Sequence, residues 1–155
     1  EVIGNDQLKT NWSENFQDKN YDIKDYSINP KLTYFSGENS RINFIYKLSS
    51  INNIIGNQES LKQQNFGISL FLNQKEKRGF ISEFNYYKNE FSGELNSVIS
   101  YVMMNGLQSG ENYTWSFKFQ RKLSKLLDIN FMYLGRKSNS LRTIHNGSIQ
   151  LKAIF

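Results

Sequence analysis

The side chains best suited to acid–base or nucleophilic chemistry gather around His145, near the end of the chain. It is the single histidine, and the chain has no cysteine. A serine hydrolase needs a hydroxyl nucleophile and an orienting carboxylate beside such a base, and the candidates are Ser138, Ser140, Ser148 and Asp128. In an extended strand His145 and Ser148 point to opposite faces, because their spacing is odd. We therefore predict no catalytic residues and no enzymatic activity, with His145 at a mouth or an interface of the fold.

Other chemistry finds even less support in the sequence. No strand face carries paired carboxylates, which weakens a glycosidase or protease interpretation. One histidine and no cysteine exclude a His-rich or thiolate metal site, so no metal and no cofactor are predicted. The net charge of +5 is spread among alternating apolar residues rather than gathered on one helix face. Nucleic acid is therefore not an expected partner.

Alternation with a period of two is the dominant pattern of the chain. It predicts antiparallel strands of about nine to eleven residues, the length that a tilted transmembrane strand needs. Aromatic residues make up 15% of a chain whose mean hydropathy is −0.60. That mixture is typical of a barrel with aromatic girdles and a polar interior. We identify seven clear strands within residues 26–155, and the fold class predicted is an all-β, antiparallel, up-and-down transmembrane β-barrel of about seven or eight strands in this chain.

The connections between these strands alternate in length. Short turns follow the strands that end near Phe35, Asn73 and Leu123. Longer loops are expected at 50–63, 88–112 and 136–141, whereas residues 1–25 are predicted as a polar loop with a possible short strand. Outer-membrane barrels have this asymmetry, with short periplasmic turns and long extracellular loops. The apolar island at 98–104 within the longest loop is compatible with a short helix, a strand extension or a loop folded onto the barrel mouth.

Each strand has one polar and one apolar face, which predicts two sets of residues with different surroundings. The polar set should line a wet lumen or contact a plug: Asn43, Lys47, Asn65, Ser69, Glu83, Asn85, Lys118, Gln120, Lys122, Asn130 and Gln150. The apolar set should face lipid: Phe44, Tyr46, Phe66, Leu70, Phe84, Trp115, Phe117, Ile129, Phe131 and Leu151.

The last strand ends on an aromatic residue. Ile149, Leu151, Ala153 and Phe155 share one face of it. A terminal aromatic at the membrane interface is common in the closing strand of outer-membrane barrels, so these residues are predicted to form an assembly signal. No run of residues is apolar enough to predict a transmembrane helix. Because the chain begins at Glu1 without a leader, we expect a processed chain or the C-terminal section of a larger barrel.

Four stretches together resemble the C-terminal barrel region of large outer-membrane or cell-surface proteins of the Bacteroidota. They are 101–115 (YVMMNGLQSGENYTW), 134–138 (LGRKS), 143–147 (TIHNG) and 150–155 (QLKAIF). The resemblance covers residues 98–155, and Ala153 departs from it, since a larger hydrophobe or Arg is usual there. It implies a location in the bacterial outer membrane and insertion by the β-barrel assembly machinery. It implies no catalytic residues and no particular transported solute.

The function expected is therefore a structural or transport role, as a translocation or pore scaffold. Its partners would be outer-membrane lipid and lipopolysaccharide, the assembly machinery, and further outer-membrane or periplasmic subunits. One alternative is a soluble cell-surface β-sandwich or barrel that binds a ligand or partner. A second alternative is an outer-membrane barrel hydrolase.

Overall fold

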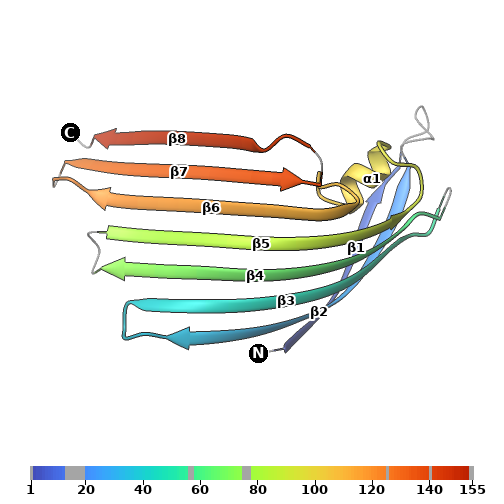
Figure 1. Ribbon diagram of the computed structural model, residues 1–155, viewed down its shortest axis with the longest axis horizontal. Coiled ribbons are helices and arrows are strands. Elements are labelled where there is room, and N and C mark those ends of the chain that lie inside the picture. Colours follow the sequence, from blue (N-terminus) through green and yellow to red (C-terminus); the bar gives the residue numbers. More distant parts are fainter. Residues whose placement is uncertain are drawn as a thin grey trace.

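Eight antiparallel strands form one sheet in which neighbours in sequence are neighbours in space (Figure 1). The computed structural model describes residues 2–12, 20–55, 58–74, 78–124, 126–139 and 141–153. The all-β antiparallel class predicted from the alternation is confirmed, and the strand order is an uninterrupted meander. The strands are β1 (Val2–Asn11), β2 (Tyr21–Phe35), β3 (Ser40–Asn53), β4 (Ser60–Gln74), β5 (Arg78–Ser92), β6 (Gly110–Lys122), β7 (Leu127–Ser138) and β8 (Ile144–Ala153).

The two ends of the sheet differ in their connections. At one end β2, β4 and β6 finish where β3, β5 and β7 begin, and these strands are separated in sequence only by residues 36–39, 75–77 and 123–126. We call this the short-turn end. At the other end lie the longer connections and the helix α1 (Val98–Met103), so we call it the helix end (Figure 1). The predicted alternation of short and long connections is thus present in the fold.

The sheet is open, which differs from a closed barrel formed by this chain alone. Among the described residues, β1 pairs only with β2 and β8 only with β7. Backbone N–H and C=O groups on the side of β1 away from β2, and on the side of β8 away from β7, therefore have no strand partner within the described chain. An open edge of this kind is a site where another strand can pair.

The residues of 98–104 fold as a helix on one face of the sheet, which settles the alternatives left open by the sequence. Ser97 caps α1, since its Oγ accepts a hydrogen bond from the Ser100 backbone N–H (3.0 Å). The chain turns away after Met104 at Asn105 and Gly106, both with positive φ, and the Gly106 N–H donates to the Tyr101 carbonyl (2.9 Å).

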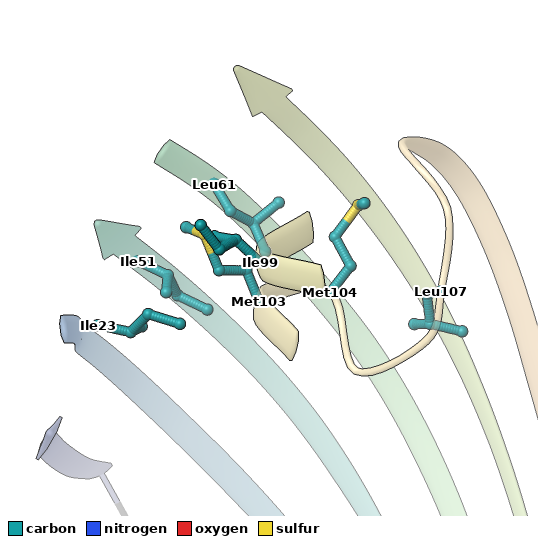
Figure 2. Packing of buried hydrophobic residues seen from close by; sticks show 7 residues of the cluster. All are labelled: Ile23, Ile51, Leu61, Ile99, Met103, Met104 and Leu107. Atoms are coloured by element: carbon teal, nitrogen blue, oxygen red, sulfur yellow. The ribbon is translucent and has the colours of Figure 1, made fainter. Parts of the chain in front are cut away.

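The buried apolar cluster of the described residues is small and lies where α1 and the segment that follows it pack on the sheet (Figure 2). Ile23, Ile51 and Leu61 reach it from β2, β3 and β4. The helix and the segment that follows it supply the remaining members, which are Ile99, Met103, Met104 and Leu107. We call the face of the sheet that carries this cluster the inner face, and the opposite face the outer face.

Several strands extend beyond the ranges that the sequence predicted. Residues 1–25, expected as a polar loop with a possible short strand, instead contain β1 and the start of β2. The loops predicted at 50–63 and 88–112 shorten to 54–59 and 93–109, and the one predicted at 136–141 is found at 139–143. In these extensions the apolar residues, such as Ile23, Ile51 and Leu61, are on the inner face, so the alternation that predicted each strand does not continue into them. Backbone pairing with neighbouring strands holds them extended instead. Ser60 at the start of β4, for example, pairs with Asn52 of β3 on one side and with Ser92 of β5 on the other.

Candidate functional site

The two residue sets predicted from the sequence lie on opposite faces of the sheet. The cross-strand register puts every residue predicted to line a lumen on the inner face, from Asn43 and Lys47 on β3 to Gln150 on β8. It puts every residue predicted to face lipid on the outer face, from Phe44 to Leu151. Ile149 and Ala153 of the predicted assembly signal also lie on the outer face, whereas Phe155 lies outside the described residues.

Polar side chains of the inner face bond to one another across strands. Thr33 Oγ1 donates to Asn43 Oδ1 (2.9 Å), and Asn43 Nδ2 donates to Ser69 Oγ (2.9 Å), which links β2, β3 and β4. Lys47 and Asp25 form an ion pair at 3.9 Å on the same face. Cross-strand pairs of this kind stabilise the arrangement of the polar side chains on the inner face.

Buried amides connect the inner face to the segment around α1. Gln63 Nε2 donates to Asn89 Oδ1 (2.9 Å), and Asn89 Nδ2 donates to the Gln108 carbonyl (3.0 Å). Asn112 accepts from the Gln108 N–H (3.0 Å) and donates to its carbonyl (2.8 Å). Arg136 adds a hydrogen bond from Nη1 to the Gly106 carbonyl (3.2 Å). The segment 93–109 is therefore fastened to the inner face by polar bonds as well as by the apolar cluster. Sequence reasoning missed Gln63, Asn89 and Asn112, because a single buried amide has no pattern along the chain.

The outer face carries a band of apolar and aromatic residues, most of them exposed. We define this apolar band as the outward-facing residues within 26–34 on β2, 42–48 on β3, 66–72 on β4, 80–86 on β5, 113–119 on β6, 129–133 on β7 and 149–153 on β8. Rings stack across strands within it, for example Phe117 and Tyr133 with centroids 6.0 Å apart. Monomeric soluble proteins rarely expose a continuous apolar surface of this extent.

The apolar band is slanted relative to the strands. One line of directly paired residues runs from Leu32 on β2 through Ile68 and Trp115 to His145 on β8. On β2 the band is centred two residues from this line toward the helix end, at Pro30. On β8 it is centred six residues from the line toward the short-turn end, at Leu151. Between β2 and β8 the centre of the band therefore moves along the strands by about eight residues over six strand-to-strand steps. With ~3.4 Å per residue and ~4.8 Å per step, the band makes an angle of roughly 40° with the line of directly paired residues.

Toward the helix end the apolar band stops at tyrosines, and charged residues follow. Tyr86 and Tyr113 lie with ring centroids 5.2 Å apart, and their hydroxyls donate to the carboxylate of Glu111 (3.2 and 3.4 Å). Beyond them on β5, Lys88 pairs with Glu90 at 3.6 Å. A ring whose apolar body lies in the band while its hydroxyl reaches charged groups is typical of a side chain at a boundary between apolar and aqueous surroundings.

His145 is part of this outer aromatic surface. Its Nδ1 lies 2.6 Å from Tyr133 Oη, its ring stacks on that tyrosine, and the Trp115 ring centroid is 6.1 Å away. Ser138, Ser148 and Asp128 lie on the inner face, opposite to the face that carries His145. The structure therefore does not bring the candidate hydrolase residues together. Ser140 is outside the described residues.

No family model, curated protein or solved structure matches this chain. Within the described ranges, no helix has the length and apolar character needed to cross a membrane. The described residues also contain no group of three or more acidic, histidine or cysteine side chains that could hold a metal ion.

Proposed function

We propose that this chain is an outer-membrane β-barrel or the C-terminal section of one, with a structural or transport role. The apolar band would face lipid, and the inner face would line an aqueous lumen. As the resemblance to Bacteroidota barrel regions implies, the location would be the bacterial outer membrane. The partners would be outer-membrane lipid, lipopolysaccharide and the β-barrel assembly machinery.

The slant of the apolar band is the observation that carries the proposal. Strands of a membrane barrel tilt by about 35–45° from the barrel axis. A flat hydrocarbon layer must then meet residues that shift steadily along successive strands, and the angle of roughly 40° estimated from the register agrees with such a tilt. The boundary tyrosines Tyr86 and Tyr113 lie where the headgroup region would begin.

The inner face supports the second half of the proposal. Buried oxygens of Asp25, Ser27, Asn29, Ser49 and Asn65 have no hydrogen-bond partner among the described residues. Unpaired polar atoms are costly inside an apolar core, so this face is poorly suited to burial under a second apolar layer. The alternative of a soluble cell-surface protein would require a second apolar layer over the whole outer face, because the buried apolar cluster is on the other side.

A cysteine scan tests the slant directly, since the chain has no cysteine of its own. Single cysteines on the outer face would be labelled with a dye whose emission reports an apolar environment, after refolding into lipid vesicles. Apolar emission is expected at positions 28 and 32 on β2 and at 149 and 151 on β8. Polar emission is expected at position 145 on β8, although it pairs in line with position 32.

Two results would overturn the proposed function. One is apolar emission at position 145 equal to that at position 151, because the apolar zone would then follow the register and not a tilted membrane. The other is a chain that stays soluble without detergent and migrates identically on gels with and without heating.

A further inference from the structure

The inner face has an excess of positive charge. Its strand residues include the cations Lys9, Lys31, Arg41, Lys47, Lys118, Lys122, Arg136 and Lys152, against the carboxylates Asp25, Glu83 and Asp128. Asp25 is already paired with Lys47. The excess is smaller on the outer face, whose strand residues include the cations Lys24, Lys62, Arg78, Lys88, Arg121 and Lys137 against the carboxylates Asp6, Asp22, Glu90 and Glu111.

The excess is greatest toward the short-turn end. Lys118, Lys122 and Lys152 lie there on β6 and β8. Asp128 on β7 is directly opposite Lys122 and Lys152, whereas Lys118 is opposite Met132. Arg41 lies over the Phe71 ring at 4.5 Å from its centroid. No carboxylate of the described chain is within ion-pair distance of Lys118, and its side chain is exposed.

Lys118 also borders a hollow of about 430 Å³ on this part of the sheet. Gln120, Asn130 and Gln150 line the hollow with side-chain amides, whose N–H groups can donate to an anion. Phe71, Ile81 and Met132 supply apolar contacts. A cation without a carboxylate partner, placed among amide donors, is suited to a carboxylate or phosphate oxygen. At the helix end, by contrast, the buried amides are already bonded to the segment 93–109.

We propose that the short-turn end of the inner face binds and conducts small anionic solutes that carry carboxylate or phosphate groups, with Lys118 as a contact residue. This inference rests on the proposed function, because it assigns a solute class to the lumen of the barrel. Rings of Lys and Arg are a known basis of anion preference in pores, and the low-dielectric wall of a barrel strengthens their field.

The test compares two variants with the same change in net charge. One carries K118E, K122E and K152E on the inner face, and the control carries K24E, K62E and K137E on the outer face beyond the apolar band. The full chain is reconstituted into planar bilayers under a KCl gradient near 0.1 M, where the Debye length is about 10 Å and fixed charges still act on ions. The wild type and the control are expected to pass chloride over potassium by about twofold or more, and the inner-face variant is expected to lose or reverse that preference.

If the reconstituted chain does not conduct ions, a labelling experiment tests anion binding at Lys118 instead. Acylation of Lys118 by an amine-reactive reagent is followed by peptide mapping in detergent, with phosphate, citrate or chloride at equal ionic strength. Phosphate or citrate should slow the labelling of Lys118 about twofold or more relative to Lys62 on the outer face. Protection by only one of the two anions identifies which group is bound.

The proposal is overturned if the inner-face variant and its control shift the reversal potential equally, or if neither anion protects Lys118. Heat-modifiable migration of the same samples separates this failure from failure of the proposed function. A chain that inserts and migrates as a barrel yet shows no anion effect refutes only the inference about solutes.

Discussion

The outer and inner faces of the sheet contain similar backbone but opposite kinds of surface. The outer face exposes rings and aliphatic chains over most of its length, whereas the inner face exposes amides, hydroxyls and lysines. Within the described part of the chain, buried apolar side chains form one small cluster between α1, the segment after it and the otherwise polar face. In a soluble sheet the apolar face is the one that other elements cover. The chain's own helix thus covers the helix end of the inner face, whereas no described helix covers the outer face.

Truncating the cluster should have the largest effect on the chain's own stability. Leu61 is 0% exposed beneath α1, so Leu61→Ala should lower the free energy of unfolding by about 2–5 kcal/mol through lost burial and a remaining cavity. Leu72→Ala, on the same strand but 41% exposed on the outer face, should change it by only about 0.5 kcal/mol in detergent. Urea titrations of both variants in one detergent measure the difference. Equal losses would mean that the two faces are packed alike.

A charge placed on the outer face should be costly only where lipid surrounds it. Phe84 lies in the apolar band, so Phe84→Arg should destabilise the vesicle-inserted protein by about 2–4 kcal/mol. Ser92→Arg is the control, since Ser92 is exposed on the same strand at the helix end, where the cost should be about 0–1 kcal/mol. Unfolding titrations in vesicles measure both effects. Should Ser92→Arg be as destabilising as Phe84→Arg, the apolar band does not mark a membrane depth.

Removing one buried amide should loosen the helix end by a smaller amount. Asn112→Ala leaves the Gln108 N–H without its side-chain acceptor and removes one of the two side-chain donors to the Gln108 carbonyl, since Asn89 remains, which should cost about 1–3 kcal/mol. Asn146→Ala, at an exposed inner-face position on β8, should be close to neutral. Limited proteolysis is the measurement, with faster cleavage within 93–109 expected for Asn112→Ala alone. Identical cleavage patterns would show that the apolar cluster fastens the segment without help from the amides.

The sequence was sufficient to assign faces where alternation is strong. In 41–49, 64–73 and 113–123 each side chain lies on the face that its position predicted. Period-two alternation is a local property of an extended chain, so it survives without knowledge of strand partners. The predicted lumen, the lipid contact and the role of Phe155 remain predictions.

Strand ends, the helix and the slant of the band depended on tertiary structure. Strand β1 and the extensions of β3, β4 and β5 do not continue the alternation of the predicted strands. Pairing with a neighbouring strand holds them extended, and pairing is a relation between distant residues. The sequence of residues 98–104 is compatible with a helix or a strand. The folded sheet brings Ile23, Ile51 and Leu61 together, and the helix packs on the apolar surface that they form. The apolar run of each strand was visible in the sequence, but its displacement from one strand to the next needed the register. The sequence by itself therefore determined which side chains are apolar and how they alternate, and only the paired sheet decided that together they form a band tilted across it.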